Sequence, residues 1–514
     1  MPLNVRALIV VLAVSAIAFH FAKPFALKRC APEEFARRRN LWFVLTIAGF
    51  LLPSFWLFVF VAAPLLLWAG KKDSNPIALY LLLMHVIPPL TEQIPVVGIN
   101  QLFSVNMYRL LSLTVLLPAA LRYRRSRDKA TAPDSRSMDL LLIAYGLLQV
   151  VLFVRPDGWN AYLYHNSLTT CLRTAFLYLL DAGLLYYVAS RTVSDRQRLN
   201  DALASFLIAC VVMAPLAVFE GLKHWALYAG LQDNLGAILM HQYNFRSGSL
   251  RAVVSAGHSL ALGYLLAVAV GFWLHLRQYE SRSWARYAVP GALVLGLVFS
   301  YSRGPWAGAL IIFMTYALLS RSAGKSGFLK MMIVTAVVGA AVLASPLGNR
   351  IVSVIPYIGK PQSINNVDYR ERLAQRSMQI IEEHPLFGDQ NAYTEMSDLR
   401  QGEGIIDFVN TYAYVAVFYG LAGLSCFAGF ILIALMRAYR TVKAVRNDAE
   451  LAHMGSSLVA TIVGTVIMIA SCSFIYGYGQ MFYVLAGLGA AYAHLGRTAA
   501  ASSKLPAAAA HAYQ

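Results

Sequence analysis

The sequence predicts an all-α fold, a polytopic transmembrane helical bundle with one large extracytoplasmic loop. Of its 514 residues, 58% are hydrophobic and 13% are charged, which is about half the charged fraction of a soluble globular domain. Its apolar residues form continuous runs, whereas the strands of a membrane barrel alternate in polarity over about ten residues. Clusters of Lys and Arg recur at every second connection between these runs. These observations exclude a disordered chain, a coiled coil and an ordinary soluble enzyme.

Apolar runs predict the membrane spans one by one, and the length of the chain allows about 12 to 15 of them. We expect the first run to be a retained helix, because it lacks the small-residue cleavage site of a secretory signal. The fourteen runs cover residues 5–22, 41–69, 76–89, 103–121, 137–154, 167–189, 199–219, 255–276, 287–300, 304–320, 329–345, 409–436, 455–472 and 479–495.

The basic clusters predict which connections face the cytoplasm, because cytoplasmic loops are enriched in Lys and Arg. With fourteen spans, both termini lie inside. Arg37, Arg38 and Arg39 conflict with this arrangement, because they would face outward. Splitting the 41–69 run at Pro53 would bring them inside and move the N-terminus out, but we expect the unbroken run. The outer connections are then 90–102, 155–166, 220–254, 301–303, 346–408 and 473–478.

Two outer connections are long enough to hold structure. In the first, Leu227, Leu231, Leu235 and Ile238 recur every three or four residues, which predicts an amphipathic interfacial helix. The second, 346–408, carries nine acidic and six basic residues.

A helix is predicted over residues 368–383 of the large loop, ended by Pro385 and Gly388. The chain as a whole divides into four predicted regions. They are the N-terminal transmembrane helices 1–240, a core 241–436 that includes the 346–408 loop, the C-terminal transmembrane helices 437–496, and a disordered tail 497–514.

Several chemical classes find no support in the sequence. The five cysteines mostly lie within apolar runs without CxxC spacing, so we expect them to pack in the core. No zinc motif, P-loop, GxGxxG or HExxH is present, so we expect no cofactor, no metal and no nucleotide-driven mechanism. The net charge of +18 arises in the cytoplasmic clusters, and no nucleic-acid partner is expected.

Arginines on the outer side are the informative feature, because the positive-inside bias disfavours them there. Arg303 lies in the very short turn Tyr301–Pro305 between two apolar runs, so its guanidinium sits at the membrane boundary and needs an anion or water. It could be a snorkelling side chain, a structural ion pair or an anion clamp. A guanidinium suits a diphosphate because it stays charged and donates paired hydrogen bonds.

Other polar side chains are predicted at the same side of the membrane. Any one of them could be a helix cap or an ion-pair partner instead of a functional group. They are Arg246, Arg251 and His258 before the 255–276 span, Ser302 beside Arg303, Arg370, Arg372, Arg376, His384 and Asp389 in the large loop, and Asp407, Asn410 and Tyr412 where the chain re-enters the membrane.

The order of these pieces resembles the O-antigen ligase/polymerase superfamily, which includes Wzy-type polysaccharide polymerases, O-antigen ligases and bacterial O-oligosaccharyltransferases. The resemblance covers about residues 240–430. It consists of an Arg-Ser-Gly segment before His258, the Ser302–Gly304 turn, an arginine-bearing outer loop running into His384–Gly388, and Asn410–Tyr412 followed by Gly420 and Gly423.

The resemblance implies glycosyl transfer at the periplasmic face of the bacterial inner membrane, by a metal-independent enzyme. The implied substrates are oligosaccharides linked through pyrophosphate to undecaprenol, and the implied partners are the growing polysaccharide and possible chain-length regulator and flippase proteins. The catalytic candidates are Arg303, Arg370, Arg372, Asp407 and His384. The substrate-binding candidates are Arg246, Arg251, His258, Ser302, Arg376, Asp389, Asn410 and Tyr412.

One departure from the family pattern favours a polymerase. Ligases of the family usually carry a histidine at the re-entry that is implicated in activating the acceptor, and this chain has Val409 there. The general base is therefore open among Asp407, Asp389, His384 and His258. The alternatives are an O-antigen ligase with the same donor, and a secondary transporter or flippase, for which Asp181 is the main ionisable residue inside a span.

Overall fold

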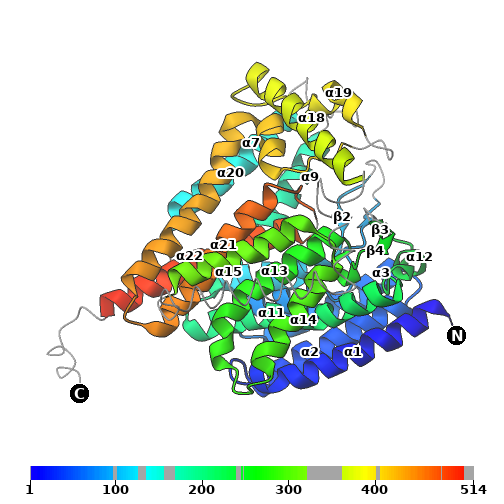
Figure 1. Cartoon of the computed structure of the whole chain (residues 1–514), viewed down its shortest axis with the longest axis vertical. Helices are drawn as coiled ribbons and strands as arrows, with labels where there is room; N and C mark the ends of the chain where they lie inside the picture. Colours follow the sequence, from blue (N-terminus) through cyan, green and yellow to red (C-terminus); the bar gives the residue numbers. More distant parts are fainter. Residues whose placement is uncertain are drawn as a thin grey trace.

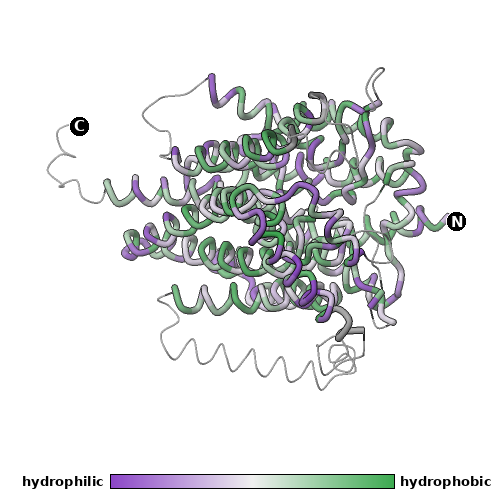
Figure 2. Tube along the Cα trace, turned by 90° about the horizontal axis from the view of Figure 1, so that it is seen from above, coloured by the Kyte–Doolittle hydropathy of each residue, from purple (hydrophilic) through white to green (hydrophobic). Residues whose placement is uncertain are grey.

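The described residues form a bundle of helices with two small hairpins (Figure 1). The computed structural model describes residues 2–95, 101–125, 135–154, 168–238, 245–246, 248–320, 362–400, 406–475 and 477–502. Strongly hydrophilic stretches gather at the ends of the helices and along one helix at the surface, with hydrophobic residues between (Figure 2). The predicted all-α, multi-pass membrane fold is thereby confirmed. The predicted span 329–345 lies outside the described residues.

Seven helices of the described part are long and apolar enough to cross a membrane, and two shorter apolar helices accompany them. The seven are Leu3–Ala26, Phe55–Lys72, Cys171–Thr192, Arg196–Lys223, Ser259–Tyr279, Thr411–Ala444 and Ala449–Ile469, and the shorter two are Ala285–Phe299 and Arg303–Leu319.

The first half of the chain contributes helices that are interrupted twice by π-helical turns. They are α1 (Leu3–Ala26), α2 (Pro32–Leu51), α3 (Phe55–Lys72), α4 (Pro76–Leu83), α5 (Met107–Leu111), π-helix η1 (Ser112–Leu116), α6 (Leu117–Arg125), α7 (Arg136–Val154), α9 (Leu168–Tyr178), π-helix η3 (Leu179–Gly183), α10 (Leu184–Thr192), α11 (Arg196–Lys223) and α12 (Gly230–Leu235).

The second half contributes the centre of the bundle and the helix of the large loop. Its elements are η4 (Val254–Ala256), α13 (Ser259–Leu276), η5 (Arg277–Tyr279), α14 (Ala285–Phe299), α15 (Arg303–Leu319), α18 (Gln362–Glu383), α19 (Ala392–Glu395), η7 (Ser397–Leu399), α20 (Thr411–Ala444), α21 (Ala449–Ile469) and α22 (Tyr478–Ser502). Nearly every side chain of α13 is buried, because α11, α14, α15 and α21 pack around it.

Two antiparallel hairpins lie at one end of the bundle. Strand β1 (Glu92–Gln93) pairs with β2 (Ser104–Val105), and β3 (Phe245–Arg246) pairs with β4 (Ser249–Leu250), with Arg246 opposite Ser249. We call this end, which also carries α12 and the turn between α14 and α15, the loop end. The opposite end carries the clusters of Lys and Arg and is called the basic end.

The unbroken span predicted over 41–69 is wrong, because α2 stops at Leu51 and α3 starts at Phe55. Pro53 cannot continue a helix, since it lacks an N–H and clashes with the preceding turn. Ser54 then caps α3 by accepting a hydrogen bond from the backbone N–H of Trp56 at 3.3 Å. The alternative split at Pro53 is the arrangement that the structure has.

The split places the start of α1 at the loop end, whereas the end of α22 lies against the end of α20 at the basic end, so the prediction of both on one side is wrong. Asn4 donates a hydrogen bond to the carbonyl of Gly230 in α12, at 3.4 Å, which places the start of α1 at the loop end. Arg37 donates to the carbonyl of Lys72 at 3.0 Å, so the Arg37–Arg39 group joins the basic end. Figure 1 shows N on the side of α12 and the end of α22 on the opposite side of the molecule.

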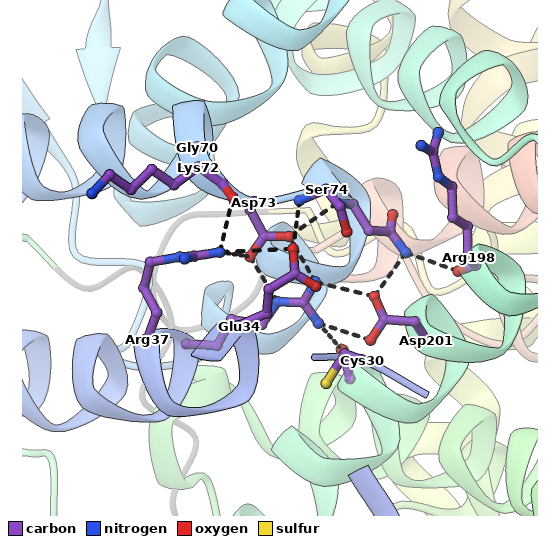
Figure 3. A network of polar contacts seen from close by, with 12 residues as sticks. Cys30, Glu34, Arg37, Gly70, Lys72, Asp73, Ser74, Arg198 and Asp201 are labelled. Atoms are coloured by element: carbon purple, nitrogen blue, oxygen red, sulfur yellow. Dashed lines mark hydrogen bonds and ion pairs between the residues drawn. The ribbon is translucent and has the colours of Figure 1, made fainter. Parts of the chain in front are cut away.

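Arg38 explains why this basic group can lie inside the bundle. Its guanidinium binds Asp73 through two hydrogen bonds of 2.8 and 2.7 Å and Asp201 through two of 2.8 and 3.0 Å. Asn75 adds a bond of 2.9 Å to Asp201. Figure 3 shows Asp73 and Asp201 in this network, with Arg37 and Glu34 at the side of Asp73. The network joins α2, the α3–α4 turn and α11.

The interfacial helix predicted within 220–254 is also wrong. In the described residues 224–238, the α-helical part is α12, six residues long, which is followed by Gly236 with a φ of 65°. Leu227, Leu231 and Leu235 are buried, because α12 packs on α1 and α2, whereas the Ile238 side chain is 63% exposed. The three- to four-residue spacing of these leucines therefore reflects their packing against the helical bundle.

The helix predicted over 368–383 is confirmed and begins earlier, at Gln362. The predicted start of the disordered tail at residue 497 is wrong, because α22 continues to Ser502. Residues 503–514 lie outside the described residues.

Candidate functional site

Arg246 and Arg251, two of the predicted site residues, contact the α14–α15 turn at the loop end. The hairpin β3–β4 brings them there, since Ala252 just after it donates its N–H to the carbonyl of Phe299 at 2.9 Å. Arg246 donates to the carbonyl of Tyr301 at 3.1 Å. Arg251 donates to Ser302 Oγ at 3.0 Å and to the carbonyl of Ser300 at 3.4 Å. The hairpin and the turn thus form one unit.

The turn itself has an unusual backbone. Tyr301 is buried and has a φ of 46°, a region that bulky side chains rarely adopt and that persists only where surrounding contacts hold it. Ser302 is fully buried, and its hydroxyl lies 3.1 Å from the carbonyl of Ser259 at the start of α13. The carbonyls of Ser300 and Tyr301 are turned toward the two arginines, so the strained turn provides their acceptors.

Arg303 and Arg370 complete a cluster of four positive charges. Arg303 begins α15 directly after this turn, and Arg370 on α18 donates to the carbonyl of Ser471 at 3.3 Å. Burial, Arg303 and Arg370 lower the pKa of Arg246, and burial, Arg246 and Arg303 lower the pKa of Arg251. We call Arg246, Arg251, Arg303 and Arg370 the arginine cluster.

The arginine cluster has a positive charge that the described carboxylates leave unpaired. None of the ion pairs found in the described part of the chain includes any of its four members. Three members are half-buried and Arg370 is exposed. A half-buried guanidinium whose described partners are carbonyls, a hydroxyl and other guanidiniums favours a bound anion. An anion with two or more negative charges would match this cluster best.

Glu220 near the end of α11 supports the hairpin, and sequence reasoning missed it. Its carboxylate is 1% exposed and accepts backbone hydrogen bonds from Leu227 at 2.8 Å and from Val253 and Val254 at 2.9 Å each. It lies beside Lys223 at the end of an apolar run. A carboxylate in such a place is ordinarily an interfacial residue, so the sequence offered no signal for its role.

Asp407 contacts the same segment, residues 471–473, as Arg370 of the arginine cluster. Its backbone N–H and carbonyl both bond to the hydroxyl of Tyr369 at 3.1 Å, and its Oδ1 accepts from Ser473 at 3.0 Å. Arg370 contacts Ser471 two residues earlier. Segment 471–473 therefore contacts both a carboxylate and a guanidinium.

The predicted segment His384–Gly388 docks α18 onto α20. Its carbonyls at Pro385 and Leu386 accept hydrogen bonds from the backbone of Leu421 and Ala422, at 2.8 and 3.1 Å. These donors are free because Gly420 breaks α20 with a φ of 62° and a ψ of −168°. A Cβ on Gly420 would lie 2.3 Å from the Leu386 carbonyl. The segment is thus a backbone joint that requires glycine.

The remaining predicted residues of the large loop lie elsewhere. His384 is exposed at the end of α18, and Asp389 accepts a bond of 2.9 Å from the backbone of Asn391. Arg376 binds Gln379 and the carbonyl of Glu395, both at 3.0 Å. Arg372 is exposed. No hydrogen bond or ion pair between described residues joins Arg372 or Arg376 to the arginine cluster.

Three further predicted residues have structural contacts. Asn410 caps α20 by accepting from the N–H groups of Tyr412 at 2.9 Å and Ala413 at 3.2 Å. Tyr412 donates its hydroxyl to the carbonyl of Val466 at 2.9 Å. His258 caps α13 through its Nδ1, which accepts from Leu260 at 3.1 Å. None of these contacts, all between described residues, involves a member of the arginine cluster.

Asp181 pairs with an arginine that sequence reasoning missed. It lies in π-helix η3, and Arg109 binds it through Nε at 3.0 Å and Nη2 at 2.7 Å. Arg109 also donates to the carbonyl of Ser104 at 2.8 Å. In the described part of the chain, no group of three or more His, Cys, Asp or Glu side chains is arranged to hold a metal ion.

One comparison with known proteins covers this site. Residues 288–428 match the family model Wzy_C, described as O-antigen ligase. The match confirms the predicted resemblance to the O-antigen ligase/polymerase superfamily. The search of curated proteins found no match.

The Wzy_C match contains Arg303, Arg370, Asp407 and the joint between α18 and α20, whereas Arg246, Arg251 and Glu220 lie before it. It supports an enzyme that transfers glycosyl groups and acts on lipid-linked oligosaccharides, as the family description implies. The hairpin outside the match supplies half of the arginine cluster.

Proposed function

We propose that this multi-pass membrane protein polymerises undecaprenyl-pyrophosphate-linked oligosaccharide repeat units into an exopolysaccharide or O-antigen. The observation that carries the proposal is the arginine cluster, which gathers four positive charges at the loop end without a described carboxylate partner. A lipid diphosphate fits this cluster, because its anionic part must stop at the membrane boundary while its lipid stays between helices.

The cluster would stabilise the departing diphosphate. An acceptor sugar hydroxyl attacks C1 of the donor sugar, the bond between C1 and the diphosphate oxygen breaks, and undecaprenyl diphosphate leaves with the bonding electrons. Negative charge grows on the diphosphate as this bond breaks. Fixed guanidiniums therefore stabilise the transition state more than the bound donor, which is the condition for raising the rate.

Asp407 is the best candidate for the general base that takes the proton of the acceptor hydroxyl. Its carboxylate is half-buried and lies on the segment that also contacts Arg370. The contacts of the other three candidates involve other segments: His258 caps α13, Asp389 accepts from the backbone of Asn391, and His384 is exposed at the end of α18.

Sidedness follows from the distribution of charge. The Lys and Arg clusters of the basic end favour the cytoplasm, which would put the arginine cluster at the periplasmic face of a bacterial inner membrane. A chain-length regulator and a flippase would act with the enzyme there, because the repeat units must be delivered to that face and the polymer must be ended.

Substituting Arg303 tests the proposal in a cell that makes one defined polysaccharide. We expect Arg303→Ala to leave single repeat units and Arg303→Lys to give shortened polymer, because Lys keeps the charge and loses the paired donors. Arg372→Ala is the matched control, since this arginine is exposed on α18. Polymer of normal length with normally expressed Arg303→Ala would contradict the proposed role.

An O-antigen ligase is the second candidate, and the description of the matched family favours it. A ligase uses the same donor and a different acceptor. In a deletion strain, a missing ligase leaves full-length polymer on the lipid, whereas a missing polymerase leaves single repeats. The length of the accumulated lipid-linked glycan therefore separates the two.

A further inference from the structure

Glu220 is the most deeply buried carboxylate near the site. It is 1% exposed and accepts three backbone hydrogen bonds, one from Leu227 through Oε1 and two from Val253 and Val254 through Oε2. It has no ion pair within the described part of the chain. Its contacts fix the positions of two loop segments relative to α11.

The backbone that Glu220 holds is strained. Val254 has a φ of 48°, and a β-branched side chain in this region is a true outlier that other contacts must stabilise. The N–H of Val254 itself is one of the three donors to Glu220. Removing the carboxylate would leave the N–H groups of Val253 and Val254 without this acceptor and would release the strained conformation.

Arg251 is two residues before this contact. Between them, the N–H of Ala252 bonds to the carbonyl of Phe299 at 2.9 Å, so the segment 251–254 is fixed on one side by α11 and on the other by the α14–α15 turn. Arg251 then reaches Ser302 and the carbonyl of Ser300. Glu220 and Arg251 are therefore linked by a short backbone segment in which Ala252, Val253 and Val254 each donate a hydrogen bond.

We propose that Glu220 is a positioning residue that sets the place of Arg251 and thereby the affinity of the site for its diphosphate. The inference rests on the proposed function in one respect, namely that the arginine cluster binds a polyprenyl diphosphate. If the Glu220 carboxylate only stabilised the fold, its loss would lower the amount of folded protein. The affinity of each folded molecule for the diphosphate would then stay unchanged.

A double-mutant cycle on the purified, detergent-solubilised chain separates the two roles, with farnesyl diphosphate as the probe and farnesol as the uncharged control. Gln at position 220 can accept through one atom only, so at least one of the three bonds is lost. We expect Glu220→Gln to weaken binding about tenfold and Glu220→Ala to weaken it more. Because Glu220 acts through Arg251, the double variant Glu220→Gln with Arg251→Ala should bind like Arg251→Ala alone.

Arg370 provides the matched control, since it belongs to the same cluster but is held by α18 and Ser471. In the Arg370→Ala background, Glu220→Gln should weaken binding by the same factor as it does in the wild-type protein. Asp201→Asn, which alters a buried carboxylate at the basic end, should leave binding unchanged. Thermal unfolding of each variant gives the fraction of folded protein. The protein concentration in the binding measurements is corrected for that fraction.

Additive effects of Glu220→Gln and Arg251→Ala, or unchanged affinity in Glu220→Gln, would overturn the positioning role and leave the proposed function intact. Failure of the wild-type protein to distinguish farnesyl diphosphate from farnesol would instead overturn the diphosphate site, and the positioning role with it.

Discussion

At the scale of single residues, the proposed role of Asp407 as the general base can be tested directly. We expect Asp407→Asn to lower kcat by a factor of about 100 or more while the KM for the donor changes little, because the arginine cluster stays intact. Asp389→Asn is the matched control, since it makes the same chemical change at a carboxylate that accepts from Asn391. Equal kcat values for Asp407→Asn and the wild-type protein would exclude Asp407 as the base.

The arginine cluster was predictable because its members break the positive-inside rule. Arg246, Arg251, Arg303 and Arg370 all stand out in outer connections of the sequence. The choice of Arg370 over Arg372 was not predictable, because two residues apart on a helix point to different sides and the phase of α18 depends on its packing. Glu220 was missed because its partners are backbone N–H groups, which no sequence pattern identifies.

Among the elements, the joint between α18 and α20 positions Arg370. Gly388 and Gly420 both have positive φ, and a Cβ on either would lie 2.3 Å from a backbone atom of the other segment. The sequence pointed to both glycines, but their mutual approach could not be foreseen, because it depends on a break in a helix that reads as continuous.

Substituting Gly420 tests this joint. We expect Gly420→Ala to lower the free energy of unfolding by more than the about 1 to 2 kcal/mol of a left-handed α residue, because its φ of 62° with a ψ of −168° is essentially restricted to glycine and an added Cβ would meet the Leu386 carbonyl. We also expect weaker donor binding as α18 shifts. Gly236→Ala is the control, because Gly236 has a φ of 65° and nothing within 4 Å of an added Cβ. Equal losses in the two variants would show that the close approach is unimportant. Thermal unfolding with a diphosphate-binding assay measures both effects.

The first helices show where element boundaries escape sequence reasoning. The composition of 41–69 predicts one apolar run. Pro53 could have indicated a break, but the alternation of basic clusters favoured fourteen spans and therefore an unbroken run. Packing decided the matter, since Arg38 finds Asp73 and Asp201 only if α2 and α3 are separate. Similarly, the leucine spacing of 227–235 fits an interfacial helix and a short packed helix equally well, and burial against α1 and α2 distinguishes them.

Arg38 holds the basic end together, and its loss should be costly. Removing it leaves Asp73 and Asp201 buried without their charge partner, so we expect Arg38→Ala to destabilise the protein by about 3 to 5 kcal/mol. Arg37→Ala is the neighbouring control and should cost about 0 to 1 kcal/mol, because its ion pairs are long, at 3.8 and 3.7 Å. Similar unfolding temperatures for the two variants would contradict this assignment.

For the whole molecule, the structure predicts which parts of the surface share a side of the membrane. In a cysteine-free background, Pro2→Cys and Asp233→Cys should react with an impermeant maleimide in intact spheroplasts. Ser283→Cys should react only after permeabilisation, because η5 and its neighbours lie at the basic end. If Pro2→Cys, like Ser283→Cys, reacted only after permeabilisation, the start of α1 would lie on the cytoplasmic side. That result would contradict the structure and support the arrangement with both termini on one side.

We propose that four guanidiniums with no ion pair among the described residues make the loop end a site for transfer of glycans from a lipid diphosphate. The direct measurement is to incubate the purified protein with a polyprenyl-diphosphate-linked repeat unit and to follow glycan length on a gel together with released polyprenyl diphosphate. We predict a ladder of products with one lipid diphosphate released per added unit, and neither with the variant that combines Arg303→Ala and Arg370→Ala. An undiminished ladder from that variant, or no transfer and no released diphosphate from the wild-type protein, would contradict it.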